Sequence, residues 1–343
     1  MNWPELLSSL VKGEDQPAEA TAWAMEAILN GEATPAQMAG FVIGLRSKGE
    51  TVQELTGLAD MMIEFATPIE IGGPAVDVVG SGGDRSNTVN ISTMAAIVAA
   101  AAGARVVKHG NRAASSACGA ADVLEALGVV LDLAPEVQQQ VVDQVGIGFL
   151  FAAQYHPALR HASATRRELG IPTIFNFLGP LANPAQPISQ AVGVADPRMA
   201  ELMAGVFASR GNYGLVVHGG DGLDEVTTTT SSTVWVYADQ DVSRVELDPE
   251  LLGVPRATVA DLVGGDAAVN AQVVREVVAG RPGPIQDVVV LNAAAALVAY
   301  GKPTAPRLEH DFADELQRAR QAIESGAAQS KLREWIAVTQ SLR

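Results

Sequence analysis

Residues 75–84 have the sequence AVDVVGSGGD, the most informative stretch of the chain. Its apolar part, Ala75 to Val79, predicts a short buried strand, and a helix is expected from Ser92 onward. Between the two, the glycines allow the backbone to fold so that successive N–H groups point at one anion. A strand, a glycine-rich loop and the start of a helix are the layout of a phosphate-binding site. The stretch therefore predicts phosphate binding within a strand–helix unit.

Two common glycine-rich loops do not match this stretch. The dinucleotide-binding pattern G-x-G-x-x-G fails because position 85 is arginine, and no Lys-Ser or Lys-Thr pair completes a Walker pattern. Two later segments indicate what the loop binds instead: KHGNRAASS at residues 108–116 and DGLDE at residues 221–225. Lysine, asparagine, arginine and serine followed by an acidic pair indicate a polyphosphate that is held with a divalent cation.

Composition limits the classes of partner. The chain has 343 residues, 48% of them hydrophobic, and its 39 acidic against 23 basic residues give a net charge of -16. Such a surface repels nucleic acid and anionic lipid, so we expect neither a nucleic-acid nor a membrane partner. The single Cys118 excludes an internal disulfide and fits a reducing compartment. Because the N-terminus also lacks an export signal, a cytoplasmic protein is expected.

The first 67 residues are expected to form a small all-helical domain. Thr34-Pro35 is typical of a helix N-cap followed by a first-turn proline, and Gly49 marks the end of that helix. Thr51-Val52-Gln53-Glu54 is a capping box in front of another apolar helical stretch. No part of residues 1–67 has the pattern of a strand.

From residue 75 onward, apolar runs predict strands, and Ala-rich stretches between several of them predict helices. The expected strands are Val76–Val79, Arg105–Lys108, Val129–Leu131, Ile147–Phe151, Gln190–Val194, Leu215–His218, Val226–Thr230, Val234–Tyr237 and Arg244–Leu247. Short apolar strands separated by helices indicate a central, mostly parallel sheet, to which the last three can add antiparallel strands. Residues 73–343 are therefore expected to form a large α/β domain. Within it, residues 171–189 contain Phe175 and Phe177, which need burial, and are expected to return to the helical domain.

The three polar segments are expected to meet at one edge of the sheet. In open parallel sheets, ligands bind at the carboxyl ends of the strands. The Gly80 loop follows the first expected strand, the Lys108 segment follows the second, and residues 221–225 follow the strand that ends at His218. This convergence predicts a single polyphosphate and cation site.

These segments, in this order, resemble the anthranilate phosphoribosyltransferase family of glycosyltransferases. The matching stretches are GSGGD at 80–84, NIST at 90–93, KHGNRAASS at 108–116, RRELG at 166–170, FNFLGPLANP at 175–184 and DE at 224–225. The resemblance covers nearly the whole chain and implies a fold like those of nucleoside phosphorylases and phosphoribosyltransferases. It implies transfer of the phosphoribosyl group of 5-phosphoribosyl 1-diphosphate (PRPP) to the amine of anthranilate. The products are N-(5-phosphoribosyl)anthranilate and diphosphate, in tryptophan biosynthesis.

The resemblance also implies residue roles. Residues expected to bind PRPP are Gly80, Gly83, Asp84, Thr88, Asn90, Ile91, Ser92, Thr93, Lys108, His109, Gly110, Asn111, Arg112, Ala113, Ala114, Ser115, Ser116 and Ala120. Gly80, Asn111 and Arg166 are expected to contact anthranilate, and Ser92, Asp224 and Glu225 to hold Mg²⁺, with two ions per subunit. Lys108, Asn111 and Arg166 are the expected catalytic residues. The family further implies a homodimer formed through the helical domain.

Some of these residues also have a structural interpretation. Arg112 suits a structural ion pair as well as it suits a phosphate contact, and Asn111 suits a turn beside Gly110. Ala120 stands where the family commonly has serine, so a side-chain contact to phosphate is missing there. Two other functions remain as alternatives: a pyrimidine nucleoside phosphorylase, and a non-enzymatic nucleic-acid-binding relative of the fold. The acidic pair disfavours both, and the net charge disfavours the second.

Overall fold

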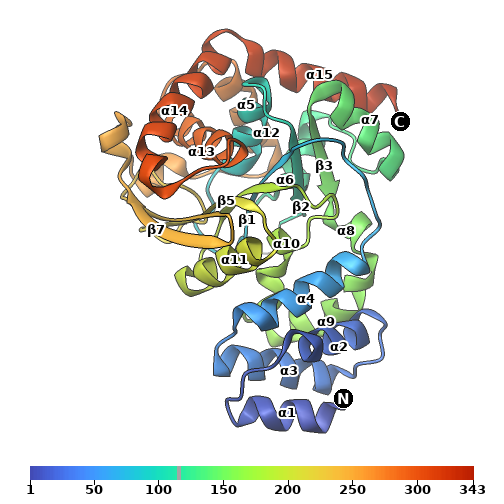
Figure 1. Ribbon diagram of the computed structural model, residues 1–343. Coiled ribbons are helices and arrows are strands. Elements are labelled where there is room, and N and C mark those ends of the chain that lie inside the picture. Colours follow the sequence, from blue (N-terminus) through green and yellow to red (C-terminus); the bar gives the residue numbers. More distant parts are fainter. Residues whose placement is uncertain (114–116) are drawn as a thin grey trace.

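The computed structural model describes residues 1–113 and 117–343. A group of helices at the N-terminal end adjoins a larger part in which helices surround a sheet (Figure 1). The N-terminal helices are α1 (Trp3–Val11), α2 (Ala18–Leu29), α3 (Pro35–Lys48) and α4 (Val52–Glu64). Both predicted helix starts are confirmed. Thr34 and Thr51 cap α3 and α4 through capping boxes with Gln37 and Glu54.

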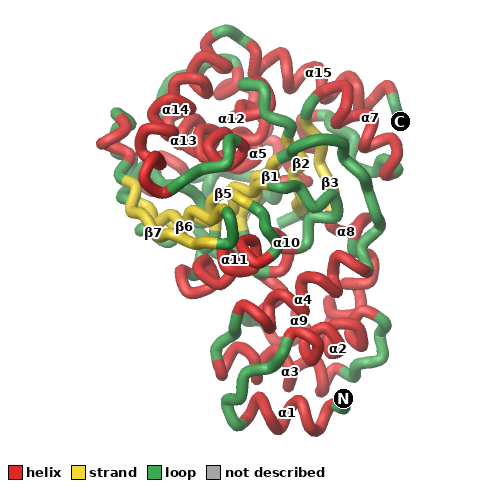
Figure 2. Tube along the Cα trace, viewed as in Figure 1, coloured by secondary structure: helices red, strands yellow, loops and turns green. Residues whose placement is uncertain are grey.

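Seven strands form one sheet in the order β3-β2-β1-β4-β5-β6-β7 (Figure 2). Their bounds are β1 Val76–Gly80, β2 Val106–Gly110, β3 Ile147–Phe151, β4 Ser189–Gly193, β5 Tyr213–Gly219, β6 Ser232–Ala238 and β7 Asp241–Leu247. Strands β1 to β5 pair in parallel, whereas β6 pairs antiparallel with β5, and β7 pairs antiparallel with β6. The predicted fold class is therefore confirmed. From β1 the chain adds strands β2 and β3 on one side, and then β4 and β5 on the other side of β1, so the strand order reverses between β1 and β4. In open α/β sheets, ligands bind at such a point.

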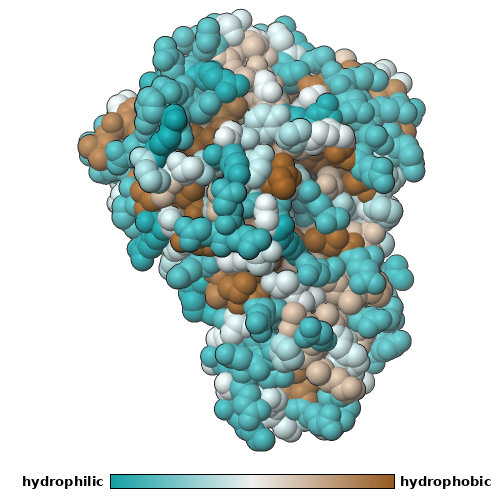
Figure 3. Space-filling view, viewed as in Figure 1, coloured by the Kyte–Doolittle hydropathy of each residue, from teal (hydrophilic) through white to brown (hydrophobic). Residues whose placement is uncertain are grey.

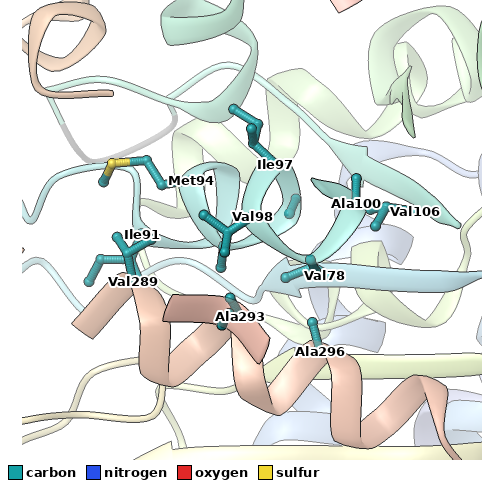
Figure 4. Close-up of a cluster of buried hydrophobic side chains, with 14 of the residues drawn as sticks. Val78, Ile91, Met94, Ile97, Val98, Ala100, Val106, Val289, Ala293 and Ala296 are labelled. Atoms are coloured by element: carbon teal, nitrogen blue, oxygen red, sulfur yellow. The ribbon is translucent and has the colours of Figure 1, made fainter. Parts of the chain in front are cut away.

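Helices cover both faces of the sheet. The helices that follow β1 are α5 (Ile91–Ala101), α6 (Ala120–Leu127), α7 (Pro135–Val145), α8 (Ala152–Tyr155), α9 (Arg160–Leu169), α10 (Leu178–Leu181), α11 (Pro197–Ser209), α12 (Ala267–Val278), α13 (Pro284–Tyr300), α14 (Leu308–Glu324) and α15 (Ala327–Ser341). Helices α5 and α13 pack against each other and against β1, and Figure 4 shows Val98 of α5, Ala293 of α13 and Val78 of β1 in the apolar cluster that they share. The opposite face is covered by α11, which also contacts α4. Alanine and valine allow this close packing of layers.

The connection between α9 and β4 packs against the N-terminal helices. Helix α9 contacts α2 and α3, and α10 contacts α4. Phe175 and Phe177 are buried in the same apolar cluster as the side chains of α1 to α4. The same cluster extends to α11 and to one face of β4, β5 and β6. The boundaries of the proposed domains, at residues 67 and 73, remain a prediction.

Two predicted strands are wrong. Val129 and Leu131 are buried, but residues 129–131 form no strand, and the backbone N–H of Val130 donates to a side chain, the Thr339 hydroxyl. Residues 226–230 form a turn-rich loop in which the backbone of Val226 is bonded to the side chain of Asn292. In both places, side chains from distant helices satisfy backbone groups that a neighbouring strand would otherwise satisfy.

The face of the molecule in Figure 3 is mostly hydrophilic, with apolar residues scattered among polar ones. This distribution fits the acidic composition of the chain. Among the helices of the described residues, none is both long enough and apolar enough to cross a bilayer.

Candidate active site

A cavity of about 330 Å³ lies at the carboxyl ends of β1 and β2 and reaches the N-terminal helices through Met62. Most of the predicted site residues line it: Gly80, Gly83, Asp84, Thr88, Asn90, Ile91, Ser92, Lys108, His109, Gly110, Asn111, Arg112, Ala113, Ala120, Arg166, Asp224 and Glu225. Thr93 is buried in α5 and lies outside this lining. The predictions for Ala114, Ser115 and Ser116 lie outside the described residues. The three polar segments therefore do meet at one edge of the sheet.

The glycine loop leaves β1 through left-handed backbone conformations. Gly82 and Gly83 have φ of 69° and 90°, which glycine adopts without steric cost. Arg85 and Asn87 follow with φ of 61° and 50°. Here the loop is held in place by a second segment, because the Gly264 N–H donates to Asn87 O at 2.9 Å. The chain then enters α5, whose first turn lines the cavity.

The amide of Asn90, at the end of this loop, is fixed on both sides. Its Oδ1 accepts a hydrogen bond from Asn270 Nδ2 of α12 at 2.9 Å, and its Nδ2 donates to Cys118 O at 3.1 Å. Asn270 is in turn oriented by the Gly265 N–H, which donates to its Oδ1 at 2.8 Å. The C-terminal part of the chain therefore supports the glycine loop, although its sequence contained no sign of this role.

Three carboxylates gather beside the glycine loop. One oxygen from each of Asp84, Asp224 and Glu225 lies within 4.8 Å of the other two. Burial and the neighbouring charge of Asp84 raise the pKa of Asp224 to about 6. Burial and the charges of Asp224 and Asp84 raise the pKa of Glu225. Glu225 Oε2 is buried without a hydrogen-bond partner in the described structure. Such a group of oxygen ligands suits a hard divalent cation.

Two glycines allow Asp224 to approach the sheet this closely. A Cβ atom on Gly193, at the end of β4, would lie 1.5 Å from Asp224 O. A Cβ atom on Gly80, at the end of β1, would lie 2.3 Å from Asp224 Oδ2. The Gly82 N–H donates to the same carboxylate oxygen at 2.6 Å. The acidic segment is therefore packed directly against the strand ends at the point where the strand order reverses.

Lys108 extends beneath this cluster and is almost fully buried. Its ammonium donates to Val78 O and, at 3.1 Å, to Ser92 Oγ. Burial lowers the pKa of Lys108 to about 8, against the opposing charges of Asp77, Glu225 and Asp224. Ser92, a predicted metal ligand, accepts a hydrogen bond from Lys108 in this structure. Asp84, which was expected to contact PRPP, lies with Asp224 and Glu225 in the cluster of three carboxylates.

A second buried layer supports the KHGNR segment. Asp77 of β1 accepts hydrogen bonds from the His109 N–H at 3.1 Å and from Asn183 Nδ2 at 2.8 Å. His109 Nδ1 bonds to the carbonyl of Gly179 at 3.0 Å, so it carries the proton and Nε2 carries the lone pair. Burial lowers the pKa of His109 to about 3, so the ring is neutral.

Arg166 of α9 and Asn111, which follows β2, also line the cavity. The Arg166 guanidinium lies over the Phe175 ring, 5.3 Å from its centroid, and burial lowers its pKa. Within residues 1–113 and 117–343, this guanidinium makes no ion pair or hydrogen bond. Asn111 is exposed, and among the described residues its Oδ1 accepts only the N–H of the next residue, at 2.8 Å.

Arg112 forms a structural ion pair, one of the two roles that the sequence allowed for it. Its guanidinium pairs with Glu125 of α6 at 2.5 Å and with Asp122 at 3.1 Å, and these carboxylates raise its pKa. It also lies over the Phe151 ring, 5.4 Å from the centroid. In this structure the charge of Arg112 is therefore used within the protein.

Sequence reasoning missed part of the lining. The connection from β3 to α10 contributes His156, Leu159, Phe175, Asn176 and Gly179. Residues 175–184 are one of the stretches that resemble the family, and this resemblance is the sign in the sequence that they approach the site. A larger cavity of about 520 Å³ lies between α4, β4 and α11, away from the carboxylates. The Arg210 guanidinium in this cavity is already paired with the Asp60 carboxylate at 2.6 Å.

Comparison with known proteins agrees with this geometry. Residues 4–66 match the helical bundle domain of a glycosyl transferase family, and residues 72–329 match its a/b domain. The anthranilate phosphoribosyltransferase of Thermobifida fusca is 56% identical over 99% of this chain and 97% of its own length. This chain belongs to the anthranilate phosphoribosyltransferase family. The enzyme from Arthrobacter sp. is 55% identical over 98% of this chain and 96% of its own length.

Solved structures of the family have the same fold. The crystal structure of anthranilate phosphoribosyltransferase from Thermus thermophilus has a TM-score of 0.91 at 38% identity, covering 98% of this chain and 99% of that one. The Saccharomyces cerevisiae enzyme, in complex with PRPP and Mg, has a TM-score of 0.89 at 25% identity, covering 99% and 98%. The helical part and the mostly parallel sheet are thus arranged as in the family's solved structures.

Proposed function

We propose that this chain transfers the phosphoribosyl group of PRPP to the amine of anthranilate in tryptophan biosynthesis. The products are N-(5-phosphoribosyl)anthranilate and diphosphate. One observation carries the proposal: the glycine loop, the KHGNR segment and the Asp224–Glu225 pair line a single cavity. Membership of the family supports the same reaction.

The glycine-loop side of the cavity is assigned to PRPP. The left-handed turns at Gly82 and Gly83 open the backbone toward an anion, and the first turn of α5 presents further N–H groups. Lys108 supplies a buried positive charge beneath the site. These groups are fixed before the substrate arrives, so they stabilise the charge that develops on the leaving diphosphate without reorganisation.

The three carboxylates fit Mg²⁺, because they offer hard oxygen ligands and Glu225 Oε2 has no protein partner in the described structure. When bound, Mg²⁺ neutralises the diphosphate leaving group. Asp224 and Glu225 would hold the cation, with Asp84 on the glycine loop as a third carboxylate. Ser92 would join these ligands only if its hydroxyl oxygen bound the cation while it also accepted the hydrogen bond from Lys108. Two ions per subunit remain part of the proposal, on the family resemblance.

The Arg166 side of the cavity is assigned to anthranilate. A guanidinium without an ionic partner among the described residues suits the acceptor's carboxylate, and Asn111 and Gly80 border the same space. The aryl amine is nucleophilic in its neutral form, so the reaction needs positioning more than a strong base. In this scheme Lys108, Asn111 and Arg166 act by charge and orientation.

Two broader features complete the proposal. A homodimer formed through α1 to α4 follows from the family resemblance, and a cytoplasmic location follows from the resemblance and from the single buried cysteine. The alternative functions, a pyrimidine nucleoside phosphorylase and a nucleic-acid-binding protein, are not favoured by relatives at 52–56% identity. A sedimentation experiment that finds only monomers would overturn the dimer without affecting the reaction.

The reaction is tested by mixing the protein with PRPP, Mg²⁺ and anthranilate and following anthranilate fluorescence. Fluorescence is expected to fall, and to remain constant when either PRPP or Mg²⁺ is omitted. Uridine or thymidine with inorganic phosphate serves as the control for nucleoside phosphorolysis. Release of free base, with unchanged anthranilate fluorescence, would support the phosphorylase alternative instead.

A further inference from the structure

One buried polar side chain lies behind the acidic segment and has no part in the site described so far. Residues 288–299 of α13 are all buried, and Asn292 is the only polar residue among them. Burying an amide among apolar neighbours costs free energy unless its hydrogen bonds are made. Asn292 therefore needs a partner that offsets the cost of its position in the middle of the helix.

The partner is the backbone immediately after Glu225. Asn292 Oδ1 accepts the Val226 N–H at 2.9 Å, and Asn292 Nδ2 donates to Val226 O at 2.8 Å. The second hydrogen of the same amide goes to Val288 O at 2.8 Å, one turn earlier in the helix. The side chain thus pairs with both backbone groups of Val226, as a neighbouring strand would, and Val226 is itself fully buried.

The acidic pair is in this way held from both sides. Before Glu225, the backbone of Asp224 lies against Gly193, where a single Cβ atom would come within 1.5 Å of Asp224 O. After Glu225, Asn292 fixes Val226. Helix α13 is a rigid support for this contact, because it packs on α5 and on β1, β4 and β5.

We propose that Asn292 is a positioning residue that sets Glu225 for cation binding by fixing the backbone of Val226. This inference rests on the cation site proposed above. The bonds of Asn292 reach the backbone and not the carboxylates, so Asn292 acts through the position of Glu225. Partners that orient a metal ligand in this way typically change metal affinity or activity by about 10- to 100-fold when they are removed.

Two variants separate positioning from folding. Asn292→Ala removes all three hydrogen bonds. Asn292→Ser keeps a hydroxyl that can bond to Val288 O within the helix, but it is too short to reach Val226. The matched control is Thr339→Ala in α15, because the Thr339 hydroxyl also accepts a backbone N–H, that of Val130 at 3.2 Å, and is fully buried. Circular dichroism checks that each variant is folded.

Binding of Mn²⁺ in the presence of PRPP, measured by electron paramagnetic resonance without anthranilate, gives a readout that does not depend on turnover. The Asp224→Asn/Glu225→Gln variant sets the baseline for Mn²⁺ bound to free PRPP. We expect Asn292→Ser to bind Mn²⁺ about tenfold or more weakly than the wild type. Thr339→Ala is expected to bind like the wild type.

Two results would overturn the inference while leaving the cation site intact: wild-type Mn²⁺ affinity in both Asn292 variants, or an equal loss in Thr339→Ala. A third result is distinct from these. If the wild type binds no more Mn²⁺ than the Asp224→Asn/Glu225→Gln variant, the proposed cation site itself fails, and the inference fails with it.

Discussion

The two sides of the cavity hold their polar groups in opposite ways. On the side assigned to PRPP, Lys108 and Asp224 are buried and already bonded to protein groups. On the side assigned to anthranilate, Asn111 is exposed, and the Arg166 guanidinium has no ionic partner in the described part of the chain. The first side is prepared for a highly charged ligand before it arrives, whereas the second gains its electrostatic partner only with the acceptor. The difference separates residues that should affect catalysis from residues that should affect acceptor binding.

The largest effect is expected from removing the acidic pair. Asp224→Asn combined with Glu225→Gln should lower kcat by about 100-fold or more and raise the Mg²⁺ concentration needed for half-maximal rate. The reason is that, without these carboxylates, no cation is held in place to neutralise the diphosphate leaving group. Steady-state kinetics across a Mg²⁺ series measures both quantities.

The matched control is another adjacent acidic pair, Asp314 and Glu315 in α14, which lies outside the cavity lining. Asp314→Asn with Glu315→Gln should leave the rate and the Mg²⁺ dependence near those of the wild type. Wild-type behaviour of the Asp224/Glu225 variant would remove the basis for placing a cation there.

A smaller loss is expected from Gly193→Ala, which changes no charged group. The added methyl would overlap Asp224 O, so the acidic segment has to move. Forced repacking of this kind costs about 1–3 kcal/mol, and the displaced Asp224 should lower activity roughly tenfold or more. Thermal unfolding and the Mg²⁺ dependence of the rate report the two effects.

Gly72→Ala is the control for this prediction, because no atom lies within 4 Å of its added Cβ. Equal behaviour of the two variants would mean that close packing at Gly193 does not matter.

On the acceptor side, Asn111→Ala and Arg166→Ala should mainly raise the KM for anthranilate. Losing one charge-assisted hydrogen bond costs about 1.5–3 kcal/mol, which corresponds to roughly 10- to 100-fold. The KM for PRPP should change much less. Arg167→Ala is a suitable control, since Arg167 neighbours Arg166 but is exposed and does not line the cavity. An effect on PRPP alone would reverse the assignment of the two sides.

The smallest effect concerns pH. Burial raises the pKa of Asp224 to about 6, from 3.8, and also raises that of Glu225. The metal-free folded state therefore holds protons that the unfolded state releases, and this contribution to stability is lost as the pH rises through about 6. Mg²⁺ binds the deprotonated carboxylates, so its stabilising effect should grow from about pH 5 to about pH 7.5, by roughly 1–3 °C in Tm. Scanning calorimetry with and without Mg²⁺ measures this difference. A Tm shift that is independent of pH would contradict the role of these carboxylates.

Much of the site was predictable because its segments are local. The GSGGD loop and the KHGNR segment begin at the carboxyl ends of β1 and β2, and the Asp224–Glu225 pair follows β5. Parallel strands bring their carboxyl ends together. The capping boxes at Thr34 and Thr51 were predictable for the same reason, since each joins residues within one helical turn. The roles of individual residues within those segments, including each expected contact to PRPP, remain predictions.

What the sequence did not reveal depends on partners far along the chain. The expected strand at 226–230 is absent because Asn292, 66 residues later, takes the place of a strand partner. Asp84 joins Asp224 and Glu225 only after folding places the segment that follows β5 against the ends of β1 and β4. His156 and Asn176 approach the cavity through the connection between α8 and α10, whose path depends on packing against α2, α3 and α4. No periodicity of the sequence indicates such contacts.

The separation of the two sides is tested most directly by calorimetric titration of PRPP with Mg²⁺, in the absence of anthranilate. The Asp224→Asn/Glu225→Gln variant should lose measurable PRPP binding, whereas Arg166→Ala should bind PRPP with nearly wild-type affinity. The opposite pattern, with PRPP affinity retained in the first variant and lost in the second, would contradict the account.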